Sequence, residues 1–152
     1  MDKLYRIIGQ CRYGIHDISR TELDDNGLPR FNMPFELGLF LGARRYGGKD
    51  QKTKRALILD REPYRYQKFI SDLAGMDPKS HDGDVETAIE RTRDWLRSVS
   101  RRNLPAGPQV IALHRKFTAQ LPVIAAGIGF DAARIPYSDF ERIITDWLVS
   151  QK

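Results

Sequence analysis

The chain has 152 residues, 41% of them hydrophobic, which suits one folded domain and excludes a disordered chain. The net charge of +5 is a mild excess of basic over acidic residues, and no apolar stretch approaches the ~20 residues of a membrane span. The single cysteine, Cys11, excludes an intramolecular disulfide and a multi-cysteine zinc site. The first residues lack the long apolar core of a signal peptide, so we expect a cytoplasmic protein.

The N-terminal part of the sequence alternates between helical and strand patterns. Residues 3–11 repeat apolar side chains at helical spacing, with Asp2 as the candidate N-cap. The run RYGIHDIS reads as a short buried strand that ends near Ser19. The run RALILD, residues 55–60, is apolar without alternation, as in a strand covered on both faces.

The segment between these strands is a polar loop followed by a helix. The loop contains an Asn-Gly turn, and Asn32 is the candidate cap of the helix, with Pro34 in its first turn. Gly47 and Gly48 mark the expected helix end near Tyr46. A strand, helix and strand in this order predict a right-handed parallel unit.

The C-terminal half is predicted to be helical. Residues 84–99 form an amphipathic pattern, Pro108 can open a second helix, and Pro122 is expected to interrupt or kink it. Ser138 and Glu141 have the spacing of a capping box for the last helix. We therefore predict one α/β domain with a short parallel sheet.

Within that domain the sheet and its helices are expected in residues 1–75 and the helical part in residues 84–152. A short helical segment is expected over residues 64–74 and a loop over residues 75–84. Basic residues are densest over residues 97–103, at an expected helix end where cations complement the helix dipole. We therefore do not expect nucleic acid as a partner. The alternative is a nucleic acid or another phosphate ligand that binds Arg91, Arg93, Arg97, Arg101 and Arg102.

Ligands of parallel sheets bind beyond the carboxyl ends of the strands. The polar residues expected there are Asp17, Ser19, Arg20, Asn32, Glu36, Asp60 and Tyr64. Glu36 stands out because it is the one carboxylate in an apolar run, and we expect it in the first helical turn, near the positive end of the dipole. It can hold a ribose, or stabilise or attack an oxocarbenium-like sugar carbon. The alternatives are that it pairs with Arg20 or Arg30, or caps a neighbouring turn.

The segment CRYGIHDISRTELDDNGLPRFNMPFELGLFLG resembles the central part of bacterial TIR-like (Toll/interleukin-1-receptor-like) proteins and is similar to the nucleoside 2-deoxyribosyltransferase fold. The residues that carry the resemblance are Asp17, Ser19, Asn32 and the run Phe35-Glu36-Leu37-Gly38. The matching region is residues 11–61. The resemblance implies a flavodoxin-like α/β fold. It also implies that Glu36 is the catalytic carboxylate of an N-glycosidic reaction on NAD or a nucleoside.

The sequence departs from these families at its start. Their members open with a strand and loop that form one wall of the ligand pocket, and this chain begins after that point. We therefore expect one of three situations: a truncated chain, a wall supplied by a partner chain, or an inactive site.

Two hypotheses of function follow. In the first, the protein is a hydrolase or base transferase acting on NAD or another nucleotide, with Glu36 as the catalytic carboxylate and no cofactor or metal. Asp17, Ser19 and Asn32 would orient the ribose, with Asp60 and Tyr64 at the rim. In the second, the domain is a non-catalytic module that binds a nucleotide or associates with itself.

Self-association is expected because a short sheet leaves an open edge, which invites pairing with another chain, and because the last helix is apolar. Two histidines lie near the predicted strands or loops of this site. His16 lies inside the first strand and is expected to be packed. His81 lies near several aspartates that lack the spacing of an EF-hand, so a cation site is not expected there.

Overall fold

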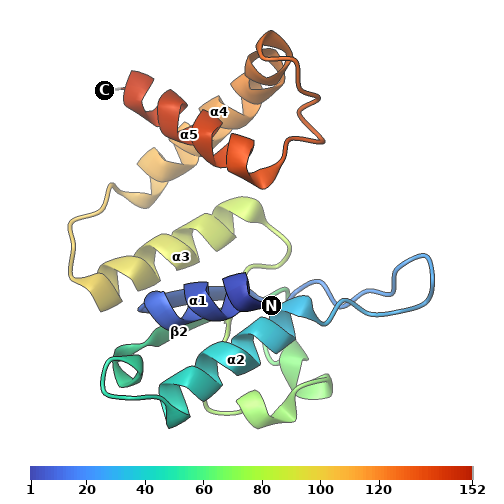
Figure 1. Cartoon of the computed structure of the whole chain (residues 1–152), viewed down its shortest axis with the longest axis vertical. Coiled ribbons are helices and arrows are strands. Elements are labelled where there is room, and N and C mark those ends of the chain that lie inside the picture. Colours follow the sequence, from blue (N-terminus) through green and yellow to red (C-terminus); the bar gives the residue numbers. More distant parts are fainter. Residues whose placement is uncertain (152) are drawn as a thin grey trace. The chain divides into compact units, whose positions relative to one another are not determined.

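The computed structural model describes residues 1–151 and divides the chain into two compact units. Unit 1 is Met1–Leu104, and unit 2 begins at Pro105. The elements of unit 1 are α1 (Asp2–Gln10), β1 (Tyr13–Asp17), α2 (Asn32–Tyr46), η1 (Gln51–Thr53), β2 (Arg55–Asp60), η2 (Arg65–Lys68), η3 (Ser71–Leu73), β3 (Lys79–Ser80) and α3 (Val85–Ser100) (Figure 1).

The sheet of unit 1 has the order β1-β2-β3, and both neighbouring pairs are parallel. In the register, Asp17 lies opposite Leu59, and Asp60 lies opposite Ser80. The α/β class with a parallel sheet and a helical C-terminal part is thus confirmed. The third strand was not predicted, and it lies in the segment expected to be a loop.

The two faces of the sheet are covered by different helices. On one face the His16 ring meets the Phe40 ring of α2 at a centroid distance of 5.3 Å. On the other face Tyr13 meets Trp95 of α3 edge-on at 6.0 Å. Because successive side chains of a strand point to opposite faces, Tyr13 and His16 define the α3 face and the α2 face of β1.

The main hydrophobic core lies on the α2 face. Its buried members come from the end of β1, from α2, from β2 and from the two short turns η2 and η3. They are Ile18, Leu37, Ile58, Tyr66 and Leu73. Leu41, Ile70 and Met76 pack around them and remain partly exposed. The burial of these side chains from segments far apart in sequence holds the carboxyl ends of β1 and β2 together.

Two helix starts differ by one residue from the predicted ones. Asn32 is the first helical residue of α2, and Phe31 occupies the N-cap without a side-chain hydrogen bond. Asp2 is likewise the first helical residue of α1. The segment over residues 64–74 forms the two short turns η2 and η3 instead of one helix.

Unit 2 is a pair of helices, α4 (Gly107–Gly127) and α5 (Tyr137–Ser150). Phe117 and Trp147 meet at 5.2 Å between ring centroids, and Ile143 is buried beside them. The Trp147 indole N–H donates to the side chain of Gln120 at 2.6 Å. Apolar packing and this hydrogen bond hold the two helices together.

The structure differs from two expectations for this unit. Pro122 lies inside α4 and does not interrupt it, because the helix continues to Gly127. The N-cap of α5 is Pro136, without a side-chain cap, so Ser138 and Glu141 form no capping box. Among residues 1–151, no helix combines the length and the apolar character needed to cross a membrane.

Candidate functional site

The ends of the three strands of unit 1 meet at one edge of the sheet. The Ile18 N–H donates to the Leu59 carbonyl at 2.9 Å, and the His81 N–H donates to the Asp60 carbonyl at 3.0 Å. These bonds extend the ladder one residue beyond β1 and β3. Asp17, Asp60 and His81 therefore lie along the edge at which parallel sheets bind ligands. We call it the carboxyl edge.

The predicted residues of the carboxyl edge divide between the two faces of the sheet. Asp17 is in register with Leu59, and the next register position joins Asp60 to Ser80. Neighbours in register share a face, and adjacent residues of a strand alternate. Asp17 therefore belongs to the α3 face, and Asp60 belongs to the α2 face.

Asp17 is the predicted residue whose carboxylate is both fixed and accessible. Its Oδ1 accepts the Ser19 N–H at 2.9 Å and lies 3.5 Å from Nε2 of His81. Partial burial alone would raise the pKa of Asp17, but the hydrogen bonds from Ser19 and the charge of His81 outweigh burial and lower this pKa. The side chain stays 46% exposed, so an ionised acceptor faces solvent here.

His81 is a residue of this edge that the sequence did not assign. Its side chain is 8% exposed, and its Nδ1 accepts the Gly83 N–H at 3.2 Å. In the neutral ring the proton therefore lies on Nε2, the nitrogen that points to Asp17. The only available signal was its place just after a strand, and a two-residue strand gives no periodic pattern.

The carboxylate of Asp60 is hydrogen-bonded to other residues of the protein. Its Oδ1 accepts hydrogen bonds from Nε and Nη2 of Arg65 at 2.9 and 2.6 Å, and from the Arg61 N–H at 2.7 Å. Arg65 also donates to the Ser19 carbonyl at 2.7 Å and to the Thr21 hydroxyl at 2.8 Å. Asp60 is 1% exposed, so the pair ties the loop after β1 to β2.

Glu36 lies in the second turn of α2, where it is half-buried. The first turn of α2 holds no acidic residue, so the predicted stabilisation by the helix dipole, which is confined to that turn, does not apply. Leu37 packs against Ile18, and Phe40 packs against His16, so α2 runs antiparallel to β1. Glu36 therefore lies at the level of the carboxyl edge, one helical turn before Phe40.

The carboxylate of Glu36 has no hydrogen bond or ion pair with any of residues 1–151. Within these residues it thus neither pairs with Arg20 or Arg30 nor caps a neighbouring turn by a hydrogen bond, the two alternatives that the sequence left open. A half-buried carboxylate without an internal partner is free to face a ligand.

The structure places the remaining predicted residues around the edge without gathering them in one cavity. Asn32 is exposed at the start of α2. Arg20 lines a hollow of about 380 Å³ in the loop after β1. Tyr64, which is 71% exposed, lines another hollow of about 290 Å³ next to β3.

Two aspartates that are near His81 in the sequence have other partners. Asp84 caps α3 by accepting the Thr87 N–H at 2.8 Å, and Asp77 pairs with Lys79 at 2.5 Å. Within residues 1–151, no group of three or more His, Cys, Asp and Glu residues is arranged to hold a metal ion.

The chain was also compared with known proteins. Neither the protein-family models, nor the curated proteins, nor the solved structures include one that matches it.

Proposed function

We propose that the carboxyl edge binds NAD or a related nucleotide and breaks its N-glycosidic bond, with Glu36 as the catalytic carboxylate. The observation that carries the proposal is the free, half-buried carboxylate of Glu36 at the edge where a parallel sheet binds its ligand. The resemblance to TIR-like and deoxyribosyltransferase-like proteins supports the same assignment. A cytoplasmic location is part of this proposal.

In this proposal Glu36 faces the anomeric carbon of the ribose. As the bond to the base breaks, positive charge develops on the sugar, and the carboxylate stabilises it or attacks it. Water that reaches the sugar carbon gives hydrolysis, and a second base gives transfer. No cofactor is required, because the nucleotide is the substrate.

The other residues of the edge bind and orient the substrate. The lowered pKa keeps Asp17 ionised at neutral pH, so in this proposal it accepts hydrogen bonds from a substrate that crosses the carboxyl edge from α2, which carries Glu36, to the α3 face. Ser19 positions Asp17, and Asn32 supplies an exposed amide. Arg20 and Tyr64 line separate hollows beside the edge, and we assign them to a phosphate group and a base of the substrate.

Asp60 has a different role in this proposal from the one expected. Because it is buried and bonded to Arg65, it holds the loop that carries Ser19 and does not touch the sugar. Asp60 and Arg65 are therefore positioning residues.

The test is to incubate the protein with NAD and with a panel of nucleosides and nucleotides. Chromatography then measures the base that is released. We expect Glu36→Gln to lower turnover roughly 100-fold or more, the scale of a catalytic carboxyl group. Glu90→Gln is the matched control, because Glu90 is an exposed glutamate of α3. Full activity in the Glu36→Gln protein would refute the assignment of the catalytic carboxylate.

A second candidate function is a module that associates with itself. Within residues 1–151, β1 pairs with β2 alone, so one side of β1 is an open edge, and Ile15 on this strand is 42% exposed. Nucleotide binding or dimer formation without any release of base would favour this candidate.

A further inference from the structure

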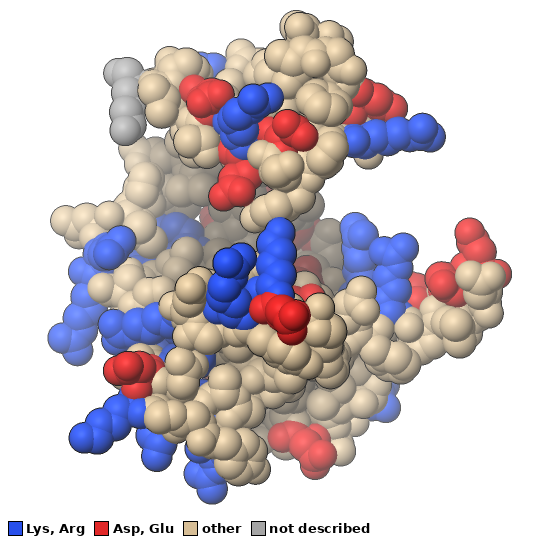
Figure 2. All heavy atoms as spheres, in the orientation of Figure 1, with Lys and Arg blue, Asp and Glu red and all other residues tan. Residues whose placement is uncertain are grey.

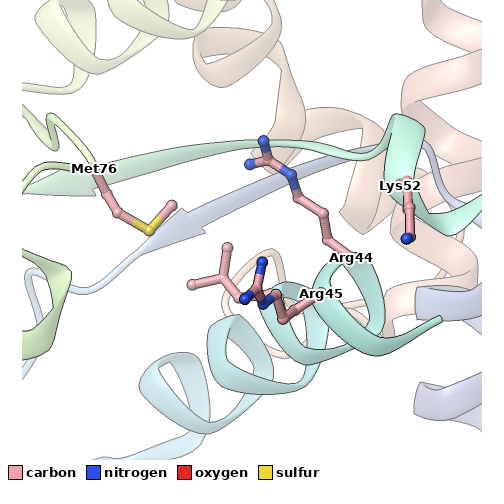
Figure 3. A pocket seen from close by; sticks show the side chains of 5 residues that line it. Arg44, Arg45, Lys52 and Met76 are labelled. Carbon is pink, nitrogen blue, oxygen red and sulfur yellow. The ribbon is translucent and has the colours of Figure 1, made fainter.

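A basic pocket lies at the end of α2 that is farthest from Glu36. It has a volume of about 430 Å³ and is lined by Leu41, Arg44, Arg45, Lys52 and Met76 (Figure 3). Arg44 and Arg45 belong to the last turn of α2, and Lys52 belongs to η1. The volume lies within the range of small-molecule sites.

The charges around this pocket are not balanced by the residues that line it. Neither the two arginines nor Lys52 forms an ion pair or a side-chain hydrogen bond with residues 1–151. No acidic residue belongs to the described lining. Cations gathered around one hollow repel one another, and a bound anion removes that repulsion.

The hollow in the loop after β1 provides a comparison in which the charges of the lining are balanced. Three arginines also line the loop hollow, but three acidic side chains line it with them. These residues are Arg20, Arg30, Arg61, Glu22, Asp24 and Asp25. One pair among them, Arg61 and Glu22, is an ion pair of 2.8 Å.

The helix dipole explains the presence of only two of the three cations in the basic pocket. Cations in the last turn of a helix are stabilised by the C-terminal carbonyls, and this explains why Arg44 and Arg45 are positively charged residues. It does not explain Lys52, which comes from a separate element beyond the glycines at residues 47–48. Figure 3 shows Arg44 extending between Met76 on one side and Lys52 on the other.

Leu41 and Met76 form the apolar part of the pocket lining, which we call the apolar floor. Leu41 and Met76 both pack against the core cluster of unit 1 while remaining partly exposed. A ligand that matches this pocket therefore has an anionic group for the cations and an apolar or aromatic group for the floor. The planar guanidinium groups favour phosphate, which they bind through paired hydrogen bonds.

The wider surface supports an anionic ligand. In Figure 2, Lys and Arg side chains gather over the end of unit 1 at which α2 and α3 finish. Such a field raises the local concentration of anions near the pocket.

We propose that the basic pocket of Leu41, Arg44, Arg45, Lys52 and Met76 binds a small phosphorylated molecule of the nucleoside diphosphate class. Two phosphates contact the three cations, and the base lies on the apolar floor. This site is separate from the carboxyl edge, and its existence does not depend on the glycosidase proposal.

The test is calorimetric titration of the full chain with pyrophosphate, with ADP and with a short single-stranded oligonucleotide. The first variant carries Arg44→Gln, Arg45→Gln and Lys52→Gln. The matched control carries Arg6→Gln, Arg91→Gln and Lys3→Gln, which removes the same residue types from exposed positions outside the pocket. Circular dichroism establishes that both variants are folded.

We expect ADP to bind more tightly than pyrophosphate, because pyrophosphate leaves the apolar floor uncovered. The pocket variant should weaken the binding of both ligands about tenfold or more, because a few charge-assisted hydrogen bonds are lost. The control should leave both affinities nearly unchanged. ADP bound only at the carboxyl edge would be insensitive to the pocket variant, and that result would overturn the proposal.

Two further results would overturn it. Equal weakening by both variants would mean that only net charge matters. Binding of the oligonucleotide alone, with a steep dependence on salt, would assign the pocket to a nucleic-acid backbone instead of a small ligand.

Discussion

Asp60 and Arg65 form a largely buried ion pair at the carboxyl edge, with Nη2 of the guanidinium 2.6 Å from Oδ1 of the carboxylate. The same guanidinium group bonds the carbonyls of Ile18 and Ser19, which lie just after β1. A residue that follows β2 therefore sets the path of the chain that leaves β1. Any ligand at this edge meets a loop whose position depends on a buried charge.

We predict that Asp60→Asn lowers the free energy of unfolding by about 3 kcal/mol, because it leaves the Arg65 charge without its partner. Urea denaturation measures the change. Asp60→Asn combined with Arg65→Gln should cost less than the sum of the two single changes, since the pair is lost as a unit. Additive costs would mean that the two side chains do not depend on each other.

The second prediction concerns acid sensitivity. His16 is 6% exposed, and neither of its ring nitrogens has a hydrogen-bond partner among residues 1–151. Burial lowers the pKa of His16 below its ordinary value of 6.5. Between the lowered pKa and 6.5 the unfolded chain binds more protons than the folded chain, so stability falls as the pH falls through this window.

Unfolding in urea at a series of pH values tests this prediction. The slope attributable to His16 can reach about 1.4 kcal/mol per pH unit. His16→Leu should flatten the dependence below pH 6.5, whereas His114→Leu, at an exposed position of α4, should leave it in place. An unchanged slope in His16→Leu would assign the acid sensitivity to another group.

The third prediction concerns a buried lysine. Lys54 is 2% exposed, and its ammonium group donates to the carbonyls of Ile8 and Cys11 at the end of α1. It also lies 4.8 Å from the centre of the Phe40 ring. We expect Lys54→Met to lower the free energy of unfolding by about 2 kcal/mol, because two carbonyls lose their donor.

The exposed neighbour Lys52 provides the comparison. Lys52→Met should change stability by less than about 0.5 kcal/mol, as most surface substitutions do. Equal effects of the two changes in urea denaturation would contradict the role given to Lys54.

The fourth prediction concerns the open edge of β1. If this edge pairs with a second copy, the chain is a dimer in light scattering at micromolar concentration. Ile15→Lys should then yield a monomer, because a charge on an edge strand opposes pairing. Leu148→Lys, at a 45% exposed position of α5, distinguishes the edge from an association through the last helix. A monomeric wild-type chain would remove the self-association proposal.

The sequence predicts those elements whose residues carry a local pattern. β2 is a continuous apolar run, and α2 ends at a pair of glycines, so the sequence predicts both elements and the end of the helix. β3 consists of Lys79 and Ser80 and is defined only by its pairing with β2. Pairing between distant segments leaves no local signal, which is why the third strand was missed.

The candidate site shows the same limit. Strand ends and helix starts indicate which residues reach the carboxyl edge, so Asp17, Ser19 and Glu36 could be proposed from the sequence. Whether a carboxylate there is free or engaged is decided by tertiary contacts. Asp60 is bonded to Arg65 and Glu36 is not bonded within residues 1–151, although the sequence predicts both as ligand contacts.

The bonds of Lys54 also bear on the order in which the chain folds. α1 has nine residues, and a helix this short is marginal by itself in water. Its final carbonyls receive their donor from a residue 43 positions beyond Cys11. During synthesis the N-terminal helix therefore lacks its stabilising contact until β2 has emerged, and it should become ordered together with the β1–β2 pair.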